Sequence, residues 1–314
     1  MEQKPIGRFA PSPSGRMHLG NAFSCLLAWL SARSKGGEMV LRLEDLDPDR
    51  CRPAYSRQLE EDLHWLGLDW DRGGLEDDPT YCQSNCTDLY ARALTVLERK
   101  SLLYPCFCSR GELHAASAPH RSDGVPIYAG TCRALTEDQR AERHRLRRPA
   151  IRIRVPDETI AFTDGNLGPY AENLRTECGD FILRRSDGVY AYQLAVVTDD
   201  GRMGITEVVR GSDLLSSTPR QILLQRELGL PAPQYYHLPL LLAPDGRRLS
   251  KRDRDLDLGA LQRRFTPNEL TGRLAVLAGL QKRPVPVSPR ELIRDFSWDA
   301  VPKRDITADF SLFD

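Results

Sequence analysis

Two short stretches, far apart in the chain, carry residues suited to binding phosphates. The first, Pro11-Ser-Pro-Ser-Gly-Arg-Met-His18-Leu-Gly20-Asn21, passes from a loop into a helical pattern. A helix N-terminus offers unpaired N–H groups and a positive dipole end to a phosphate chain. His18 can donate a hydrogen bond to a phosphate oxygen as charge builds on it, and Gly20 has no Cβ to block close approach. Alone, this stretch is as consistent with a tight turn as with a nucleotide site.

The second stretch, Arg248-Leu-Ser250-Lys251-Arg252, follows a Pro-Asp-Gly turn. A lysine on such a loop can neutralise a leaving pyrophosphate, and the hydroxyl of Ser250 precedes it. Taken alone, the run is more simply explained as a solvated basic turn. The two stretches occur together, about 230 residues apart, with a strand–helix–strand pattern around the first. This combination predicts nucleotidyl-transfer chemistry.

Three cysteines, Cys106, Cys108 and Cys132, bracket a segment rich in Gly, Pro and Ser. Three thiolates in a loop too poor in apolar residues to fold alone predict a structural zinc site. The fourth ligand stays open, because His114 and His120 lie between the cysteines and histidine is an ordinary zinc ligand. The remaining cysteines are expected to be small buried apolar residues: Cys25, Cys51, Cys82, Cys86 and Cys178.

The phosphate-binding stretch needs a strand and a helix to hold it, and residues 5–43 supply a βαβ pattern. Pro5–Ala10 is expected to be a strand, Met17–Ser34 a helix, and Met39–Leu43 a buried parallel strand. Asp45–Pro53 follows as a polar loop at the carboxyl end of that strand, where open α/β sheets bind ligands. Further helices are expected at Arg57–Leu66, Cys86–Lys100, Gln221–Leu228, Asn268–Leu280 and near Pro289–Phe296.

The middle of the chain has a different character. Arg140–Arg154 holds seven arginines against one glutamate, which indicates either a surface that contacts RNA phosphates or a solvated face. Strand-like stretches are expected at Ile151–Val155, Thr159–Thr163, Phe181–Arg184, Ala191–Asp200 and Gly204–Leu215. The predicted fold class is α/β: a Rossmann-like parallel sheet, a zinc-containing α+β insertion and a short helical C-terminal piece.

Composition excludes several classes of protein. The 314 residues carry 44 basic and 44 acidic side chains, so a nucleic-acid site must be a local patch rather than a global charge. No apolar run approaches the ~18 residues that span a bilayer, and the N-terminus lacks the apolar stretch of a signal peptide. Cysteines without a secretion signal suggest reduced thiols. We therefore expect a cytoplasmic protein that does not contact membranes, and a monomer.

The chain resembles class I aminoacyl-tRNA synthetases. His18-Leu-Gly20-Asn21 is similar to their HIGH signature and Arg248–Arg252 to their KMSKS loop, with Asn21 and Leu249 as the departures. Arg8-Phe9-Ala10-Pro11-Ser12, Leu41-Arg-Leu-Glu44-Asp-Leu-Asp47 and Tyr192–Asp200 with Arg210-Gly resemble glutamyl-tRNA synthetase. The match covers roughly residues 5–260. It implies catalytic roles for His18 and Lys251, and ATP binding, as a magnesium complex, by His18, Gly20, Asn21, Ser250 and Lys251.

The resemblance also implies a glutamate pocket and a metal ligand set. Arg8 and Arg210 would grip carboxylates and reject glutamine, whose amide would face donors. Glu44 would hold the α-ammonium, Tyr192 would donate its hydroxyl, and Phe9, Ala10, Pro11 and Ser12 would complete the wall. The family pattern Cys-x-Cys…Tyr-x-x-x-Cys favours Tyr128, with Cys106, Cys108 and Cys132, as the zinc ligands.

The short C-terminal region bears on which molecule is expected to accept the glutamyl group. Only 62 residues follow Arg252, whereas glutamyl-tRNA synthetase continues into a helical anticodon-binding domain. The resemblance is therefore to truncated paralogues that activate L-glutamate with ATP and transfer it to queuosine in the anticodon of tRNA(Asp). The expected divisions are a first catalytic half (1–104), the zinc insertion (105–178), a second catalytic half (179–252) and a helical C-terminal region (253–314). The alternatives are a minimal enzyme that charges tRNA(Glu) and a catalytically silent RNA-binding paralogue.

Overall fold

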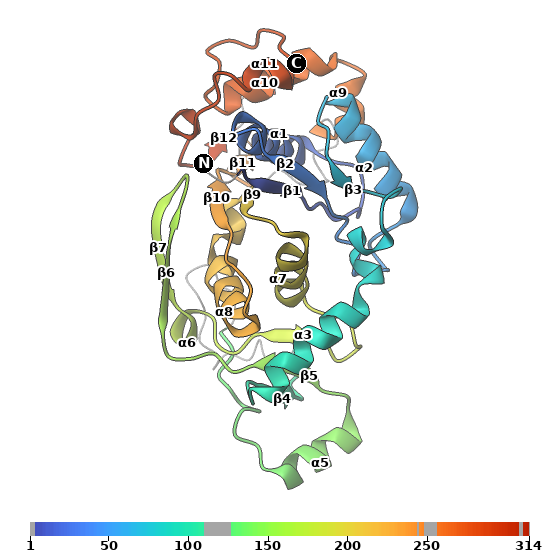
Figure 1. Cartoon of the computed structure of the whole chain (residues 1–314), viewed down its shortest axis with the longest axis vertical. Coiled ribbons are helices and arrows are strands. Elements are labelled where there is room, and N and C mark those ends of the chain that lie inside the picture. The colour runs from blue at the N-terminus through green and yellow to red at the C-terminus, as the bar shows by residue number, and fades with distance from the viewer. Residues whose placement is uncertain (1–3, 110–126, 244, 248–255, 308–309, 314) are drawn as a thin grey trace.

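The computed structural model describes residues 4–109, 127–243, 245–247, 256–307 and 310–313. Its first sheet is parallel, in the order β1 (Ile6–Phe9), β2 (Glu38–Leu41), β3 (Arg72–Gly73), with Arg8 opposite Val40. Helix α1 (Leu19–Ser34) connects β1 to β2 (Figure 1). The predicted βαβ unit is thereby confirmed.

A second parallel pair lies beside the first sheet. It consists of β9 (Glu207–Gly211) and β10 (Gln234–Leu238), joined by α8 (Thr218–Leu228). The amide of Thr206, just before β9, donates to the carbonyl of Ile6 at the start of β1 (3.0 Å). The chain leaves β1 toward β2 on one side and β9 toward β10 on the other. The carboxyl ends of β1 and β9 therefore flank a switch point, where α/β proteins bind ligands.

The strand expected at Ala191–Asp200 is wrong, because Tyr192–Met203 is helix α7. Its apolar run Leu194–Val197 is fully buried, and the helix packs against α3 (Thr87–Arg99), α8 and strand β8 (Ile182–Arg184). A helix buried all round has the same uninterrupted apolar run as a buried strand, so periodicity could not separate them. The helix ends at Gly204, whose φ of 70° is the left-handed conformation usual after a helix.

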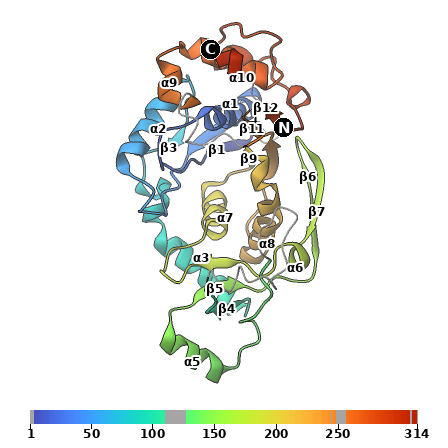
Figure 2. The same cartoon turned by 180° about the vertical axis from the view of Figure 1, so that it is seen from behind.

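The insertion is built on an antiparallel sheet, β4 (Leu103–Cys106), β5 (Ala150–Ile153) and β8 (Ile182–Arg184). A long hairpin, β6 (Thr159–Asp164) and β7 (Gly168–Asn173), runs back toward β10. Residues Glu137–Leu146 form helix α5, which we did not predict inside the basic segment. Both views place α5 at one end of the molecule and α10 (Pro267–Leu277) at the other (Figures 1 and 2).

The C-terminal region packs against α1 rather than standing apart. Trp298 Nε1 donates to Ser31 Oγ in α1 (3.0 Å), and the Trp298 ring stacks on Tyr236. Two faces of α1 are thus covered, one by the sheet and one by the tail, which is why Leu27 and Leu30 have no exposed surface. The remaining elements are α2 (Pro53–Trp65), α6 (Leu174–Glu177), α9 (Leu258–Gln262), α11 (Pro289–Leu292), β11 (Leu241–Leu242), β12 (Ile306–Thr307) and the short 3-10 turns Pro79–Tyr81, Gln83–Asn85, Ser212–Ser217, Trp298–Ala300 and Phe310–Phe313.

Among the described residues, no helix combines the length and apolar character needed to cross a membrane.

Candidate active site

A cleft of about 460 Å³ opens at the carboxyl ends of β1 and β9, beside the N-terminus of α1. It is lined by every residue predicted to bind glutamate, together with two of those predicted to bind ATP. The first group comprises Arg8, Phe9, Ala10, Pro11, Ser12, Glu44, Tyr192 and Arg210, and the second His18 and Asn21. Residues as far apart in the chain as Arg8 and Arg210 therefore share one cavity at the switch point.

His18 is the N-cap of α1, and the cap determines the state of its ring. Its Nδ1 accepts a hydrogen bond from the amide of Gly20 (3.1 Å), so the proton of the neutral imidazole must be on Nε2. The Asn21 side chain accepts from the amide of His18 (3.2 Å) and closes a capping box. A Cβ on Gly20 would come within 3.1 Å of the imidazole. The Nε2–H is the atom that could meet a phosphate at the helix N-terminus.

A second, smaller cavity of about 200 Å³ shares His18, Asn21 and Ser24 with the first. Gly20 lines this cavity, so all the described residues predicted to bind ATP lie around the N-terminus of α1. Ser250 and Lys251, predicted to complete the ATP site, lie outside the described residues.

The chain that follows those two residues is anchored beside His18. Asp257 forms a β-bridge with His18, and the amide of Leu258 donates to the carbonyl of Met17 (2.8 Å). Arg16 donates to Asp62 (3.3 Å) and to Gln262 (2.5 Å) in α9. Asp257 and Leu258 therefore lie against the His18 motif.

The two arginines of the cleft are held differently. Arg8 donates from Nη1 to the carbonyl of Val209 (3.1 Å), and burial lowers its pKa, an effect that nearby Asp200 opposes. Arg210 donates to His237, Gln221 and Thr218, at 3.1, 2.8 and 2.7 Å. These bonds engage most of the Arg210 donors. Arg210 thus offers the cleft a fixed positive charge rather than a ready two-pronged fork.

His237 supports Arg210 from behind. The ring is fully buried, with Nδ1 2.6 Å from Asp164 Oδ2 and Nε2 accepting from Arg210 Nε. Burial lowers the pKa of His237, an effect that Asp164 opposes. The neutral tautomer with its proton on Nδ1 satisfies both neighbours, because it donates to the carboxylate and accepts from the guanidinium.

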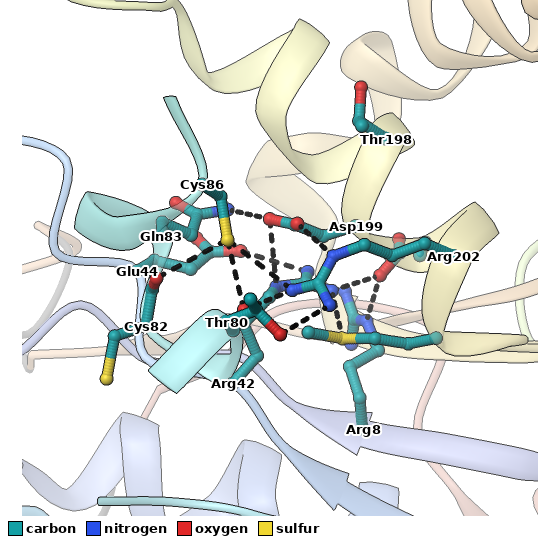
Figure 3. Close-up of polar contacts among 12 residues, drawn as sticks. Arg8, Arg42, Glu44, Thr80, Cys82, Gln83, Cys86, Thr198, Asp199 and Arg202 are labelled. Atoms are coloured by element: carbon teal, nitrogen blue, oxygen red, sulfur yellow. Dashed lines mark hydrogen bonds and ion pairs between the residues drawn. The ribbon is translucent and has the colours of Figure 1, made fainter. Parts of the chain in front are cut away.

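Glu44 lines the same cleft as Arg8 and is nearly buried, with 9% of its side chain exposed. Burial raises the pKa of Glu44, and the strongest opposing influence is Arg42, whose Nη2 donates to Glu44 Oε1 (3.1 Å). Figure 3 shows this contact within a larger buried cluster around Arg42. Burial also raises the pKa of the Tyr192 hydroxyl, which keeps it protonated and able to donate.

An adjoining cleft of about 450 Å³ shares Ser12, Ser14, Glu44 and Tyr192 with the first. Asp47, Arg50, Arg185 and Tyr190 also line this second cleft. A molecule in this second cleft would therefore approach whatever the first cleft holds.

The predicted metal ligands come together at the base of the insertion. The sulfur atoms of Cys106, Cys108 and Cys132 all lie within 4.8 Å of one another, and they could hold a metal ion. The Tyr128 hydroxyl is 3.5 Å from Cys106 Sγ and 3.9 Å from Cys108 Sγ, and it accepts from the amide of Cys132 (2.8 Å). The Tyr128 hydroxyl thus lies beside the three thiols. His114 and His120 lie outside the described residues.

Two arginines of the basic segment Arg140–Arg154 pack against tyrosine rings near the cysteine cluster instead of facing solvent. The Arg152 guanidinium lies 3.8 Å from the centre of the Tyr128 ring, and Arg154 lies 4.8 Å from that of Tyr104. Burial raises the pKa of Tyr128, so only a cation at the cluster would withdraw its proton at neutral pH. The segment Arg140–Arg154 therefore divides into an interior end and an exposed end that includes Arg145, Arg147 and Arg148.

Sequence reasoning missed the residues that support the site. Arg42, Asp200 and His237 are buried behind it, and Arg16 ties it to α9. One signal was available for Arg42: a charged residue interrupts the apolar run Met39–Leu43, and a buried guanidinium must be paired.

Comparison with known proteins agrees with this geometry. The family model for the catalytic domain of class I tRNA synthetases (E and Q) matches residues 6–307. A glutamyl-Q tRNA(Asp) synthetase from Symbiobacterium thermophilum is 52% identical over 96% of this chain and 94% of its own. Another from Nitratidesulfovibrio vulgaris is 49% identical over 98% and 97%.

Solved structures give the same result. The glutamate-tRNA synthetase of Elizabethkingia anophelis superposes with a TM-score of 0.83 at 29% identity, covering 99% of this chain and 69% of that one. A glutamate tRNA ligase from Elizabethkingia meningosepticum, solved with its amino acid, gives 0.80 at 29% identity, over 97% and 68%. The chain belongs to the class I tRNA synthetases of the glutamate and glutamine type, and within them to the glutamyl-Q tRNA(Asp) synthetase family.

Proposed function

We propose that this ligase activates L-glutamate with ATP and transfers the glutamyl group to queuosine in the anticodon of tRNA(Asp). The proposal is supported most by one observation: Arg8 and Glu44, of opposite charge, line the same cleft as the capped His18. An amino acid carries an ammonium and a carboxylate, and glutamate carries a second carboxylate. The names of the relatives that match nearly the whole chain agree with this acceptor.

In the first step, an α-carboxylate oxygen of glutamate attacks the α-phosphorus of ATP. The bond from that phosphorus to the bridging oxygen breaks, and pyrophosphate leaves with the electron pair. Glu44 binds the ammonium, Arg8 and Arg210 attract carboxylate, and Tyr192 donates its hydroxyl. His18 Nε2–H stabilises phosphate charge, with Lys251 and Ser250 as the proposed partners from the second motif. ATP enters as its magnesium complex, which lowers the charge repulsion at the phosphates.

In the second step, a hydroxyl of the queuosine cyclopentene diol attacks the carbonyl carbon of glutamyl-adenylate. The carbonyl–oxygen bond to AMP breaks, AMP leaves and a proton is released. The adjoining cleft, with Glu44 and Tyr192 in the shared wall, is the proposed entrance for this base. The exposed arginines Arg145, Arg147 and Arg148 of the insertion are proposed to bind phosphates of the same RNA.

The cysteine cluster is proposed to bind zinc. Cys106, Cys108, Cys132 and Tyr128 would supply its four ligands, a number typical of closed structural sites. Zinc there would link the end of β4 (Cys106 and Cys108) to the chain that follows residue 126 (Tyr128 and Cys132). It would take no part in the chemistry. A monomer is the proposed assembly.

The test is incorporation of labelled glutamate into two preparations of tRNA(Asp), one with queuosine and one with unmodified guanosine. We expect glutamate-dependent ATP–pyrophosphate exchange without any tRNA, and label transfer only to the queuosine-containing tRNA(Asp). Charging of tRNA(Glu) instead would identify a minimal glutamyl-tRNA synthetase. Absence of exchange would identify a catalytically silent paralogue.

A further inference from the structure

Arg42 is a fully buried arginine immediately beyond β2, with 0% of its side chain exposed. A guanidinium keeps its proton at neutral pH, so a buried one must be matched by carboxylates and hydrogen-bond acceptors. It reaches them in two directions. Nη1 donates to Asp200 Oδ1 (2.6 Å). Nη2 donates to Glu44 Oε1 (3.1 Å), and Figure 3 labels both Arg42 and Glu44. Each of these carboxylates is tied to the cleft.

Glu44 lines the cleft itself, and Asp200, which does not, lies beside Arg8, which does. Asp200 Oδ1 is 3.7 Å from Arg8 Nε, which has no hydrogen-bond partner within the described part of the chain. One guanidinium therefore contacts the proposed ammonium-binding carboxylate directly, and reaches the proposed carboxylate-binding Arg8 through a single intermediary. The unit is Glu44–Arg42–Asp200–Arg8.

The rest of the cluster does not depend on Arg42 in the same way. Asp199, 4.0 Å from Arg42 Nε, accepts hydrogen bonds from Gln83 (2.8 Å), Tyr90 (2.8 Å) and Arg202 (3.0 Å). The hydrogen bonds that Arg42 donates to Asp200 and Glu44 instead lead toward the cleft. An ion pair with a purely structural role would not need to contact Glu44 and, through Asp200, Arg8, which are the two charged residues proposed to bind the amino acid.

The charges around Glu44 are consistent with this role. The charged and titratable groups around Glu44 are Arg42, two residues before it, Arg8 from β1, and Asp200 and Tyr192 from α7. The Cys51 thiol lies 3.8 Å from the backbone carbonyl of Glu44. Burial and Asp200 raise the pKa of Glu44, whereas Arg42 and, less strongly, Arg8 lower it. Without Arg42, Glu44 and Asp200 would face each other with Arg8 as their remaining cation.

Given the proposed glutamate-binding function, we propose that Arg42 is a positioning residue for substrate recognition. It fixes Glu44 directly and Arg8 through Asp200, so that the two charges that bind the amino acid keep one separation and one orientation. Arg42 itself does not line the cleft.

The experiment compares the full-length enzyme with Arg42→Lys, Arg42→Gln and Asp200→Asn in glutamate-dependent pyrophosphate exchange. Lysine keeps the charge but has one nitrogen, so it cannot place donors at both positions that Arg42 Nη1 and Nη2 occupy. Asp200→Asn keeps Arg42 and decides the question if both Arg42 variants fail to fold. Arg202→Gln is the matched control, because it removes an arginine from the Asp199 side of the same cluster.

We expect KM for glutamate to rise about tenfold or more in Arg42→Lys and Asp200→Asn, since charge-assisted hydrogen bonds are lost behind the pocket. KM for ATP should stay within about twofold, because the phosphate site is formed by α1. Arg202→Gln should keep both constants. In Arg42→Gln the acid limb of kcat/KM should also move to higher pH, because Glu44 loses the main influence that lowers its pKa.

An unchanged KM for glutamate in the folded variants, alongside an active wild-type enzyme, would overturn the assignment of Arg42. Equal rises in KM for glutamate and in KM for ATP would overturn it too, since they would indicate general damage to the core. A wild-type enzyme that activates no glutamate would instead contradict the proposed function.

Discussion

At the scale of single residues, the site is made by atoms whose donor and acceptor roles are fixed by their neighbours. His18 and His237 illustrate this. In His18, Nδ1 accepts a hydrogen bond from the amide of Gly20, so the ring proton is on Nε2. In His237, Nδ1–H donates to Asp164, and Nε2 accepts from Arg210. The two histidines therefore adopt opposite tautomers, each suited to the group it meets.

The His18 ring has two separable roles, as helix cap and as phosphate donor. Asparagine is a good N-cap, so His18→Asn should keep the thermal midpoint, whereas His18→Ala should lose about 1 kcal/mol of stability with the cap. Both should lose roughly 10²–10³-fold in pyrophosphate exchange, since both lack the Nε2 donor. Thermal unfolding and exchange assays on the two variants measure this. Normal exchange in His18→Asn would remove the imidazole from catalysis.

At the scale of elements, Arg16 ties helix α9 to the loop before α1. Arg16 reaches across to Asp62, which is fully buried, and to Gln262. Its guanidinium occupies the space that a side chain at residue 259 would need: a Cβ on Gly259 would lie 2.2 Å from Arg16 Nη1. Gly259 is therefore explained by this close approach, not by a turn.

The effect of Gly259→Ala should depend on Arg16. In a helix, alanine is ordinarily better than glycine by about 0.5–1 kcal/mol, but here its methyl would displace the guanidinium from a buried carboxylate. We expect Gly259→Ala to destabilise the wild-type protein and to stabilise the Arg16→Ala variant. Denaturant unfolding of the four proteins of this double-mutant cycle measures the coupling. Additive effects would show that Arg16 and Gly259 do not compete for space.

At the scale of the whole molecule, the proposed site of glutamate activation and the proposed RNA-binding surface on α5 lie far apart. The glutamate cleft is at the carboxyl ends of β1 and β9, whereas β4, which ends at Cys106, and α5 lie toward the end away from α10 (Figures 1 and 2). Glutamate activation should therefore be independent of the distal end, and RNA binding should not.

Neutralising the exposed arginines of the insertion tests this separation. The triple variant Arg145→Ala, Arg147→Ala, Arg148→Ala should bind tRNA(Asp) more weakly. The salt dependence of its affinity should be shallower, by about 0.7–0.9 for each phosphate that the variant no longer neutralises. Pyrophosphate exchange should be unchanged. Lys282→Ala, Arg283→Ala and Arg304→Ala, all exposed at the opposite end of the molecule, form the control. Equal binding by the two triple variants would exclude α5 as an RNA-binding element.

The sequence was most informative where function depends on short local signals. Three such signals lie within a few positions of a recognisable element: the loop before α1, the strand ends that carry Arg8 and Glu44, and the Cys-x-Cys…Tyr-x-x-x-Cys pattern. The prediction was wrong for α7, because Leu194–Val197 is apolar on every side of the helix. It also missed α5, whose charged residues lack an apolar stripe.

By themselves, the residues determined the chemical class, the family, the βαβ unit and the identity of the groups that could bind phosphate, glutamate and metal. Only the tertiary structure decided how these groups are held: that Arg210 donates mostly to the protein itself, that His237 must be neutral, and that Arg42 joins Glu44 to Asp200. The physical reason is that motifs are local in the chain. The partners of a buried charge, by contrast, come from wherever the fold brings them, here from positions more than 150 residues away.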